Sequence, residues 1–267
     1  MRRSPGFRNL FFTLFTCVCA LLAFSTGLSA TSTVFVLGNN NNLSYNPSSG
    51  GTIPAGPYSG TLGNSSATLF FCLSGNLSAN WDTSYNGTDG PPSVQQGPLS
   101  VQVQEEAAFL ASLMLFTANQ NGINITSSLS GGYESMNQTQ TGAMSVSTFV
   151  NTVEGPISMA IWQLTNSLPT QDGVSGNDSR AAPFVAQAQA AWTNWLSNPS
   201  NPMVQTFNSN VSIFVPTGGG TQSFVSAFSD SAFISVATPE PGTIVLFGTG
   251  VLLVAAGCVR RHGRRSR

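Results

Sequence analysis

The sequence predicts an α+β domain in which β-strands lie on both sides of a central helical section. Before residue 105 and after residue 199, short apolar runs bounded by turn-forming residues are typical of strands. Between these two parts, apolar residues recur every three or four positions, as they do in helices that bury one face. No internal repeat is apparent, so residues 31–235 are expected to form one domain with its own core.

Strands are expected at both ends of this body. They are residues 33–37, 67–73, 99–103, 203–207, 211–215 and 223–228. The segments 38–66, 74–97 and 127–147 are polar and rich in Gly, Ser and Asn, and we expect loops and turns there.

Helices are expected at residues 105–119, 156–167 and 182–196. In the first, Phe109, Leu113 and Phe116 belong to a broad apolar face, which predicts a mostly buried helix. Glu105 and Glu106 stand in its expected first turn, where negative charge complements the helix dipole. We prefer this role for the two residues to one as paired catalytic carboxylates.

Residues 1–30 have the three parts of a secretory signal peptide. Arg2, Arg3 and Arg8 precede an apolar stretch at residues 10–24, and Leu28-Ser29-Ala30 then offers small residues at a cleavage site. We therefore expect the chain to be exported and this segment to be removed.

The last segment, residues 236–267, contains a second apolar run. Pro239-Glu240-Pro241 precedes the run at 243–259, and the arginines Arg260, Arg261, Arg264, Arg265 and Arg267 follow it. As a helix the run spans about 25 Å. That is short for a hydrocarbon core of about 30 Å but adequate when arginines snorkel at one end. The arginines are expected to stay in the cytoplasm as a basic tail.

This order of parts closely resembles the PEP-CTERM sorting signal of Gram-negative bacteria. The resemblance implies a chain held in the inner membrane until an exosortase, a membrane-embedded enzyme, processes it. The helix is then removed and the body goes to the cell surface or the extracellular matrix. An ordinary single-pass anchor is the alternative, although such an anchor does not need Pro-Glu-Pro at its entrance.

The body between the two ends is poor in positive charge. All nine basic residues are arginine, and only Arg180 lies in the body, which carries ten acidic residues when Glu240 is counted, a formal charge of −9. Nucleic-acid binding needs clustered cations and is excluded. The single histidine, His262, lies in the tail, so the body has no imidazole for general-base catalysis or metal binding, and we expect no cofactor.

Only Cys72 of the four cysteines survives the removal of both ends, so a disulfide within the body is impossible. A lone exported cysteine is buried and inert, paired between chains, or used chemically.

Three short motifs resemble those of the bacterial surface thioester domain. They are Phe71-Cys72-Leu73, Glu105-Glu106-Ala107-Ala108-Phe109-Leu110 and Met159-Ala160-Ile161-Trp162. The resemblance covers residues 67–230. It implies a strand cysteine joined to a glutamine side chain just before Ala-Ile-Trp, in a thioester that can acylate a partner surface and give covalent adhesion.

The chain departs from this pattern at the glutamine. Cys72 and Ala160-Ile161-Trp162 match, but the family's glutamine falls on Ser158. A thioester needs the acyl carbon of Gln or Glu, and a serine hydroxyl offers only a second nucleophile. We therefore expect the fold without the thioester, with Cys72 as a small buried hydrophobic residue.

A calcium site is a weaker candidate. Residues 82–87 match the first half of a calcium loop, with oxygen-bearing side chains at Asp82, Ser84 and Asn86 and Gly at the sixth position. Asp89 could add an oxygen, but the twelfth position is Ser93 where the loop needs glutamate. Plain Asn-Gly and Asp-Gly turns explain the same residues.

The sequence thus favours a non-enzymatic surface or matrix protein with a structural or adhesive role in an exopolysaccharide-rich envelope or biofilm. Its expected partners are the exosortase and exopolysaccharide or other envelope components. One alternative is a covalent adhesin that uses Cys72. Another is a polysaccharide hydrolase with two carboxylates drawn from Asp82, Asp89, Glu105 and Glu106.

Overall fold

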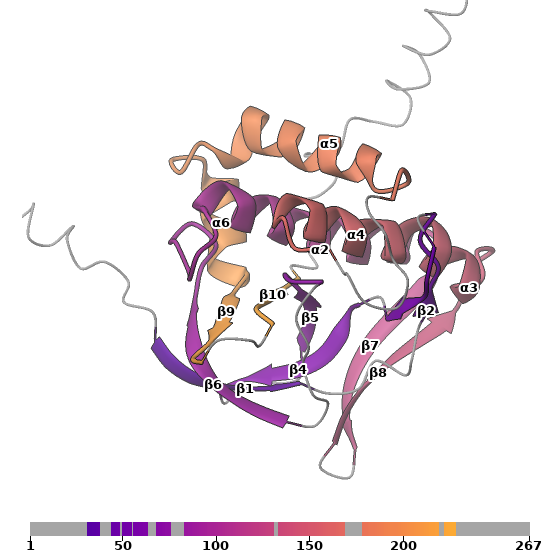
Figure 1. Cartoon of the computed structure of the whole chain (residues 1–267). Helices are drawn as coiled ribbons and strands as arrows, with labels where there is room; N and C mark the ends of the chain where they lie inside the picture. Colours follow the sequence, from indigo (N-terminus) through magenta and orange to yellow (C-terminus); the bar gives the residue numbers. More distant parts are fainter. Residues whose placement is uncertain are drawn as a thin grey trace, which may run out of the picture.

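The structure is a computed structural model that describes residues 31–37, 44–48, 50–54, 56–63, 68–75, 83–130, 133–168, 178–218 and 222–227. The expected signal peptide and the sorting segment lie outside these residues, so their structure, and the domain limits at 31 and 235, stay predictions. The described residues combine helices and sheets in an α+β fold (Figure 1).

Six antiparallel strands close into a barrel at one side of the molecule (Figure 1). In order around the barrel they are β1 (Thr31–Leu37), β4 (Tyr58–Leu62), β5 (Thr68–Cys72), β10 (Phe224–Ser226), β9 (Ile213–Pro216) and β6 (Thr83–Gly90). Cys72 pairs with Phe224, so strands from the two ends of the chain are neighbours. The barrel includes strands at the positions expected, 33–37, 67–73, 211–215 and 223–228, so these four predictions are confirmed.

Two barrel strands, β4 and β6, fall where loops were expected. Their sequences, rich in Gly, Ser and Asn, have little strand propensity, so their pairing partners must decide their conformation. Gly87 in β6 shows one such constraint, because an added Cβ would lie 2.4 Å from the Val215 carbonyl oxygen of β9. The two strands approach too closely there for any other residue.

Helix α2 (Val101–Gln120) packs on the barrel and is buried from Gln104 to Met114. Its N-cap is Ser100, whose hydroxyl accepts a hydrogen bond from the Val103 backbone N–H at 3.3 Å. The strand expected at 99–103 was wrong, because alternating valines in a short run do not separate a strand from the first turn of a capped helix. Glu105 and Glu106 lie beyond the first turn, so the helix-dipole role expected for them was also wrong.

One nearly continuous helical segment lies beside α2 and completes the helical layer (Figure 1). Helix α3 (Val146–Phe149), the π-helical turn η1 (Val150–Glu154) and helix α4 (Gly155–Leu164) follow one another without a break. Pro156, which has no backbone N–H, lies in the first turn of α4, and only Gly155 separates it from the widened turn. The helix expected at 156–167 is confirmed, with an earlier start.

Helix α5 (Ala182–Ala191) and the π-helical turn η2 (Trp192–Leu196) confirm the helix expected at 182–196. Figure 1 shows α5 on the outside of the layer formed by α2 and α4. Helix α6 (Pro202–Asn210) replaces the strand expected at 203–207. Asn201 caps it by accepting from the Met203 N–H at 2.9 Å, and Pro202 suits its first turn.

The segment 127–147, expected to be a surface loop, instead contributes to a hairpin of β7 (Ile123–Ser130) and β8 (Tyr133–Gln140) beside the barrel (Figure 1). At its base Gly122 adopts φ +67°. The Gly122 carbonyl accepts from the backbone N–H groups of Thr141 at 2.7 Å and Gly142 at 2.9 Å. Glycine permits this conformation, so a polar sequence closes into a hairpin.

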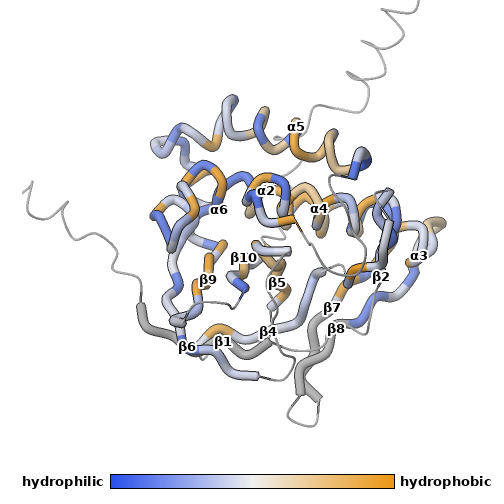
Figure 2. Tube along the Cα trace, viewed as in Figure 1, coloured by the Kyte–Doolittle hydropathy of each residue, from blue (hydrophilic) through white to orange (hydrophobic). Residues whose placement is uncertain are grey.

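The core lies between the barrel and the layer of α2 and α4. Its largest fully buried side chains include Phe70, Phe71, Phe109, Phe149 and Phe214. Figure 2 shows strongly hydrophobic stretches on α4, β5 and β9. None of the helices in the described part of the chain is both long and apolar enough to cross a membrane, and the expected membrane helix at 243–259 lies outside that part.

Gly155 gives a direct test of the contact between the helical layer and the short strand pair of β2 (Ser44–Tyr45) and β3 (Ile53–Pro54). A Cβ added at Gly155 would lie 2.1 Å from the buried Tyr45 ring. Alanine normally stabilises a helix interior relative to glycine by about 1 kcal/mol. We expect the opposite sign for Gly155→Ala, a loss of about 1–3 kcal/mol from overpacking, measured by urea unfolding.

Ala186→Ser is the control for this variant, because it adds one atom at an exposed position of α5 and should leave the unfolding free energy nearly unchanged. A stabilising Gly155→Ala would show that Tyr45 does not pack on this helix as described.

Candidate functional site

Strand β5 and helix α4 meet at the residues that carry the thioester-domain resemblance. The Trp162 indole N–H donates to the Cys72 carbonyl oxygen at 3.0 Å, in a buried contact. Just beyond the strand, the Ser167 hydroxyl donates to the Leu73 carbonyl at 3.0 Å. The fold therefore places Cys72 next to the helix that bears Ala160-Ile161-Trp162.

Cys72 itself is only 6% exposed and has no disulfide partner among the described residues. Burial raises the pKa of its thiol well above the usual value, and a hydrogen bond with the Tyr58 hydroxyl offsets only part of this rise. The thiolate is the nucleophilic form of cysteine, and this environment suppresses it. The Cys72 side chain therefore behaves as a small buried group.

Ser158, which stands at the family's glutamine position, is also buried. Its hydroxyl donates to the Glu154 backbone carbonyl at 3.0 Å, one helical turn earlier. This local bond is the common one for a serine within a helix. The Ser158 hydroxyl thus has a structural partner on its own helix, and its side chain has no acyl carbon to give to Cys72.

The Glu154 carboxyl and the Gln138 carboxamide, which the motifs did not predict, lie close to the contact between β5 and α4. Gln138 of β8 donates from Nε2 to Glu154 Oε2 at 2.5 Å, and Glu154 Oε1 has no hydrogen-bond partner in the described part of the chain. Glu154 lies near enough to Tyr58 that its ionised form would raise the pKa of that phenol, and Tyr58 bonds to Cys72. We call Tyr58, Cys72, Gln138, Glu154 and Ser158 the buried polar cluster.

Glu154 is a neutral acid at neutral pH. Its side chain is fully buried, and burial raises its pKa to about 8 against a smaller opposing effect of the Gln138 hydrogen bond. With a protonated thiol and a protonated carboxyl, the buried polar cluster holds no charged nucleophile and no ionised base. A lone acidic residue between Val153 and the apolar start of α4 was the signal in the sequence that could have revealed it.

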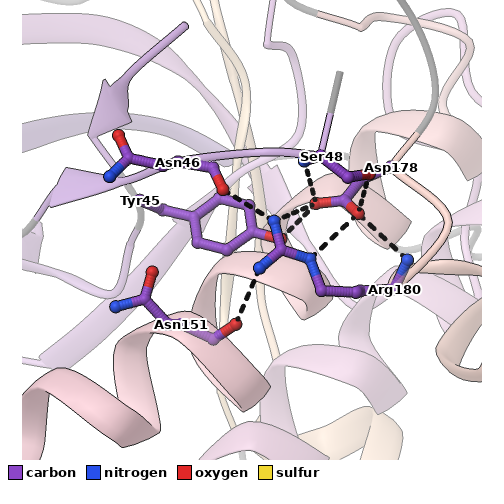
Figure 3. Close-up of polar contacts among 6 residues, drawn as sticks. All are labelled: Tyr45, Asn46, Ser48, Asn151, Asp178 and Arg180. Atoms are coloured by element: carbon purple, nitrogen blue, oxygen red, sulfur yellow. Dashed lines mark hydrogen bonds and ion pairs between the residues drawn. The ribbon is translucent and has the colours of Figure 1, made fainter. Parts of the chain in front are cut away.

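A second polar cluster contains the body's one cation (Figure 3). The Arg180 guanidinium donates to both carboxylate oxygens of Asp178, at 3.1 and 3.2 Å, and to the Asn46 carbonyl at 2.6 Å. It also lies over the Tyr45 ring, 4.8 Å from the ring centre. The Tyr45 hydroxyl and the Ser48 hydroxyl donate to the same carboxylate.

This ion pair fastens the segment around Tyr45 to the start of α5. Burial alone would raise the pKa of Asp178, but the hydrogen bonds from Tyr45, Arg180 and Ser48 outweigh it and hold that pKa below its usual range. The donors are all engaged with the carboxylate or with backbone oxygens. The arrangement is therefore structural, and it presses the Tyr45 ring onto Gly155.

The carboxyl groups considered for hydrolysis have separate partners. Glu105 accepts from the Asn208 amide at 3.1 Å and the Trp192 indole at 3.2 Å, whereas Glu106 accepts from Gln102 at 2.9 Å. Burial raises the pKa of both glutamates. Each is thus held by neutral donors on α2, α6 or η2 and is buried within the fold.

The described residues of the weak calcium candidate lie on a strand, whereas plain turns were the preferred explanation for them. Ser84, Asn86 and Asp89 lie on β6, which pairs with β1 and β9, whereas a calcium loop must curl its oxygens around one point. Because side chains alternate along a strand, Ser84 and Asn86 point away from the face of Asp89. Asp82 lies outside the described residues. In the described part of the chain, no three His, Cys, Asp or Glu side chains are grouped to hold a metal ion.

The C-terminal segment is the part of the chain that matches a known family model. Residues 237–261 match the family model of the PEP-CTERM protein-sorting motif. The match includes Pro239-Glu240-Pro241 and ends within the arginine-rich tail, so the sorting signal expected from the sequence is confirmed. A PEP-CTERM motif implies an exosortase substrate that passes through the membrane on its way to secretion or the cell surface.

The body in front of the motif is less similar to known proteins. No curated protein matches the chain in sequence. Among solved structures, the N-terminal thioester domain of fibronectin-binding protein SfbI from Streptococcus pyogenes is similar at 10% identity and a TM-score of 0.31. The alignment covers 76% of this chain and 95% of that domain. This weak likeness is consistent with the resemblance noted in the sequence, and it carries no argument about chemistry.

The protonated state of Glu154 leads to a test by pH. In the folded protein Glu154 holds a proton that the unfolded chain releases above about pH 4.5. Its contribution to stability is therefore complete below pH 4.5 and declines as the pH rises towards 8, by up to about 1.4 kcal/mol per pH unit. Glu154→Gln keeps the shape of the side chain and an oxygen that can accept from Gln138, but it cannot ionise.

We expect the wild-type unfolding free energy, minus that of Glu154→Gln, to fall between pH 5 and pH 8 and to level off above that pH. Urea unfolding at pH 5, 6.5 and 8 measures this difference, and subtraction removes the titration of Glu105, Glu106 and Asp178. An identical pH dependence in the two proteins would contradict a buried, protonated Glu154.

Proposed function

We propose that this chain is a non-enzymatic surface or extracellular-matrix protein of a Gram-negative bacterium. Its role is structural or adhesive in an exopolysaccharide-rich envelope or biofilm. The observation that carries the proposal is the PEP-CTERM motif at residues 237–261, placed after an acidic body of α+β fold. The N-terminal signal peptide and the C-terminal helix direct export and sorting, and the body between them has the structural or adhesive role.

The chemistry of the body supports a binding role over a catalytic one. In the buried polar cluster, Cys72 and Glu154 are held in their neutral forms, and Ser158 is engaged by its own helix. A covalent adhesin would need an accessible acyl thioester at Cys72, and the burial of the thiol speaks against one. A carboxylate-based hydrolase would need two facing carboxyl groups, and those of Glu105 and Glu106 have different partners.

Exosortase processing is testable through the motif itself. We expect the triple variant Pro239→Ala, Glu240→Ala, Pro241→Ala to accumulate uncleaved in the inner membrane, because the processing enzyme no longer recognises the entrance to the helix. Cell fractionation followed by immunoblotting of the body measures the shift from the surface and medium to the membrane, which should involve most of the protein.

Ser235→Ala lies just outside the matched residues and is the control, with release expected to equal that of the wild type. Normal release of the triple variant would refute sorting through this motif. It would favour the reading of the C-terminal segment as a dispensable tail, because an ordinary anchor would keep the protein in the membrane.

A further inference from the structure

A cavity of about 550 Å³ opens between the end of β6 and helix α6. Its wall on the α6 side includes Gln205, Asn208 and Ser209, at positions i, i+3 and i+4, which share one face of a helix. Asp89 and Gly90 at the end of β6 line the opposite wall. The volume falls in the range of about 300–1,000 Å³ that is typical of small-molecule sites.

Asn208 lines this cavity and has a buried side-chain oxygen, Oδ1. The residue is only 8% exposed, and its Nδ2 donates to Glu105 Oε1 at 3.1 Å. Glu105 in turn is fixed through its second oxygen by the Trp192 indole at 3.2 Å. This network sets the orientation of the Asn208 amide and leaves Oδ1 without a hydrogen-bond donor among the described residues.

The lining also determines the charge of the ligand. It contains the Asp89 carboxylate, the amides of Gln205 and Asn208, and serine hydroxyls, and it contains no cation. The body's one basic residue, Arg180, is engaged with Asp178. Anionic ligands such as phosphates and uronic-acid polymers therefore meet only repulsion here. The residues Pro91, Pro199 and Val211 add apolar surface between the polar groups.

We propose that this cavity binds a short segment of a neutral polysaccharide. A neutral sugar is rich in hydroxyl donors for the Asp89 carboxylate and the Gln205 amide oxygen, and the C–H faces of its rings suit the proline and valine surfaces. The inference rests on the proposed envelope role for its biological setting, and it names the class of ligand that this role requires.

The cavity binds sugar without cleaving it. Glycoside hydrolysis uses two carboxyl groups that flank the scissile bond. Asp89 is the one carboxyl-bearing residue in the cavity lining, and Glu105 stands behind Asn208 in the bonded network. The product of the interaction is therefore a bound complex.

Isothermal titration calorimetry on the full chain, purified in detergent, tests the proposal. The probes are glucose hexamers with β-1,4, β-1,3 or α-1,4 links, with a galacturonate oligomer as the anionic comparison and a glucosamine oligomer as the cationic one. We expect at least one neutral hexamer to bind and the galacturonate oligomer not to bind. Asp89→Asn, which replaces one acceptor oxygen by an N–H₂ donor, and Gln205→Ala, which removes an amide, should each weaken that binding about 10-fold.

Gln189→Ala, an exposed change on α5 outside the lining, is the matched control and should leave the affinity unchanged. The proposal is overturned if no neutral hexamer binds at millimolar concentration, or if only the glucosamine oligomer binds. Binding that both cavity variants leave unchanged also overturns it. These outcomes leave sorting untouched, because fractionation of the Pro239-Glu240-Pro241 variant reads processing independently of sugar binding.

Discussion

The body must satisfy its buried carboxyl groups with a single cation, and much of its architecture follows from this shortage. Arg180 goes to Asp178, where tyrosine and serine hydroxyls complete the set of donors. Glu105, Glu106 and Glu154 receive only amide or indole N–H groups. A buried charge without a counterion is strongly unfavourable, so burial raises the pKa of all three side chains, and Glu154, whose pKa reaches about 8, keeps its proton at neutral pH.

These satisfied groups also join the separate parts of the fold. Glu154 connects the hairpin to the long helical segment through Gln138, and Glu105 connects α2 to α6 and η2. The Arg180 pair fixes the strand segment around Tyr45 to α5. Because Arg180 is the body's one basic residue, the described part of the chain presents no basic patch, which disfavours nucleic acids as partners.

Much of the fold follows from the sequence where apolar residues decide it. Strands such as β5 and β9 have apolar runs, and α2 has a broad apolar face, so each was predicted. The strands β4, β6, β7 and β8 are mostly polar or glycine and lack continuous apolar runs, and they form because a neighbouring strand or a close glycine contact requires it. For α6, a five-residue alternation was too short to separate strand from helix.

The candidate sites divide in the same way. The contact of Trp162 with Cys72 joins two motifs that were visible in the sequence. The pairing of Gln138 with Glu154 depends on the hairpin, and the cavity at Asn208 depends on α6. Both elements were missed, so neither arrangement could have been foreseen from spacing alone.

The exact mass of the protein released by its native cells, together with its terminal peptides, tests the account most directly. The account predicts a chain that begins near residue 31 and has lost the segment from Thr243 onwards. After any attached sugars are removed, its mass should show no loss of ammonia, because Cys72 retains a free thiol. An intact 27.9 kDa chain in the cytosol, or a mass deficit of one ammonia that Cys72→Ala abolishes, would contradict it.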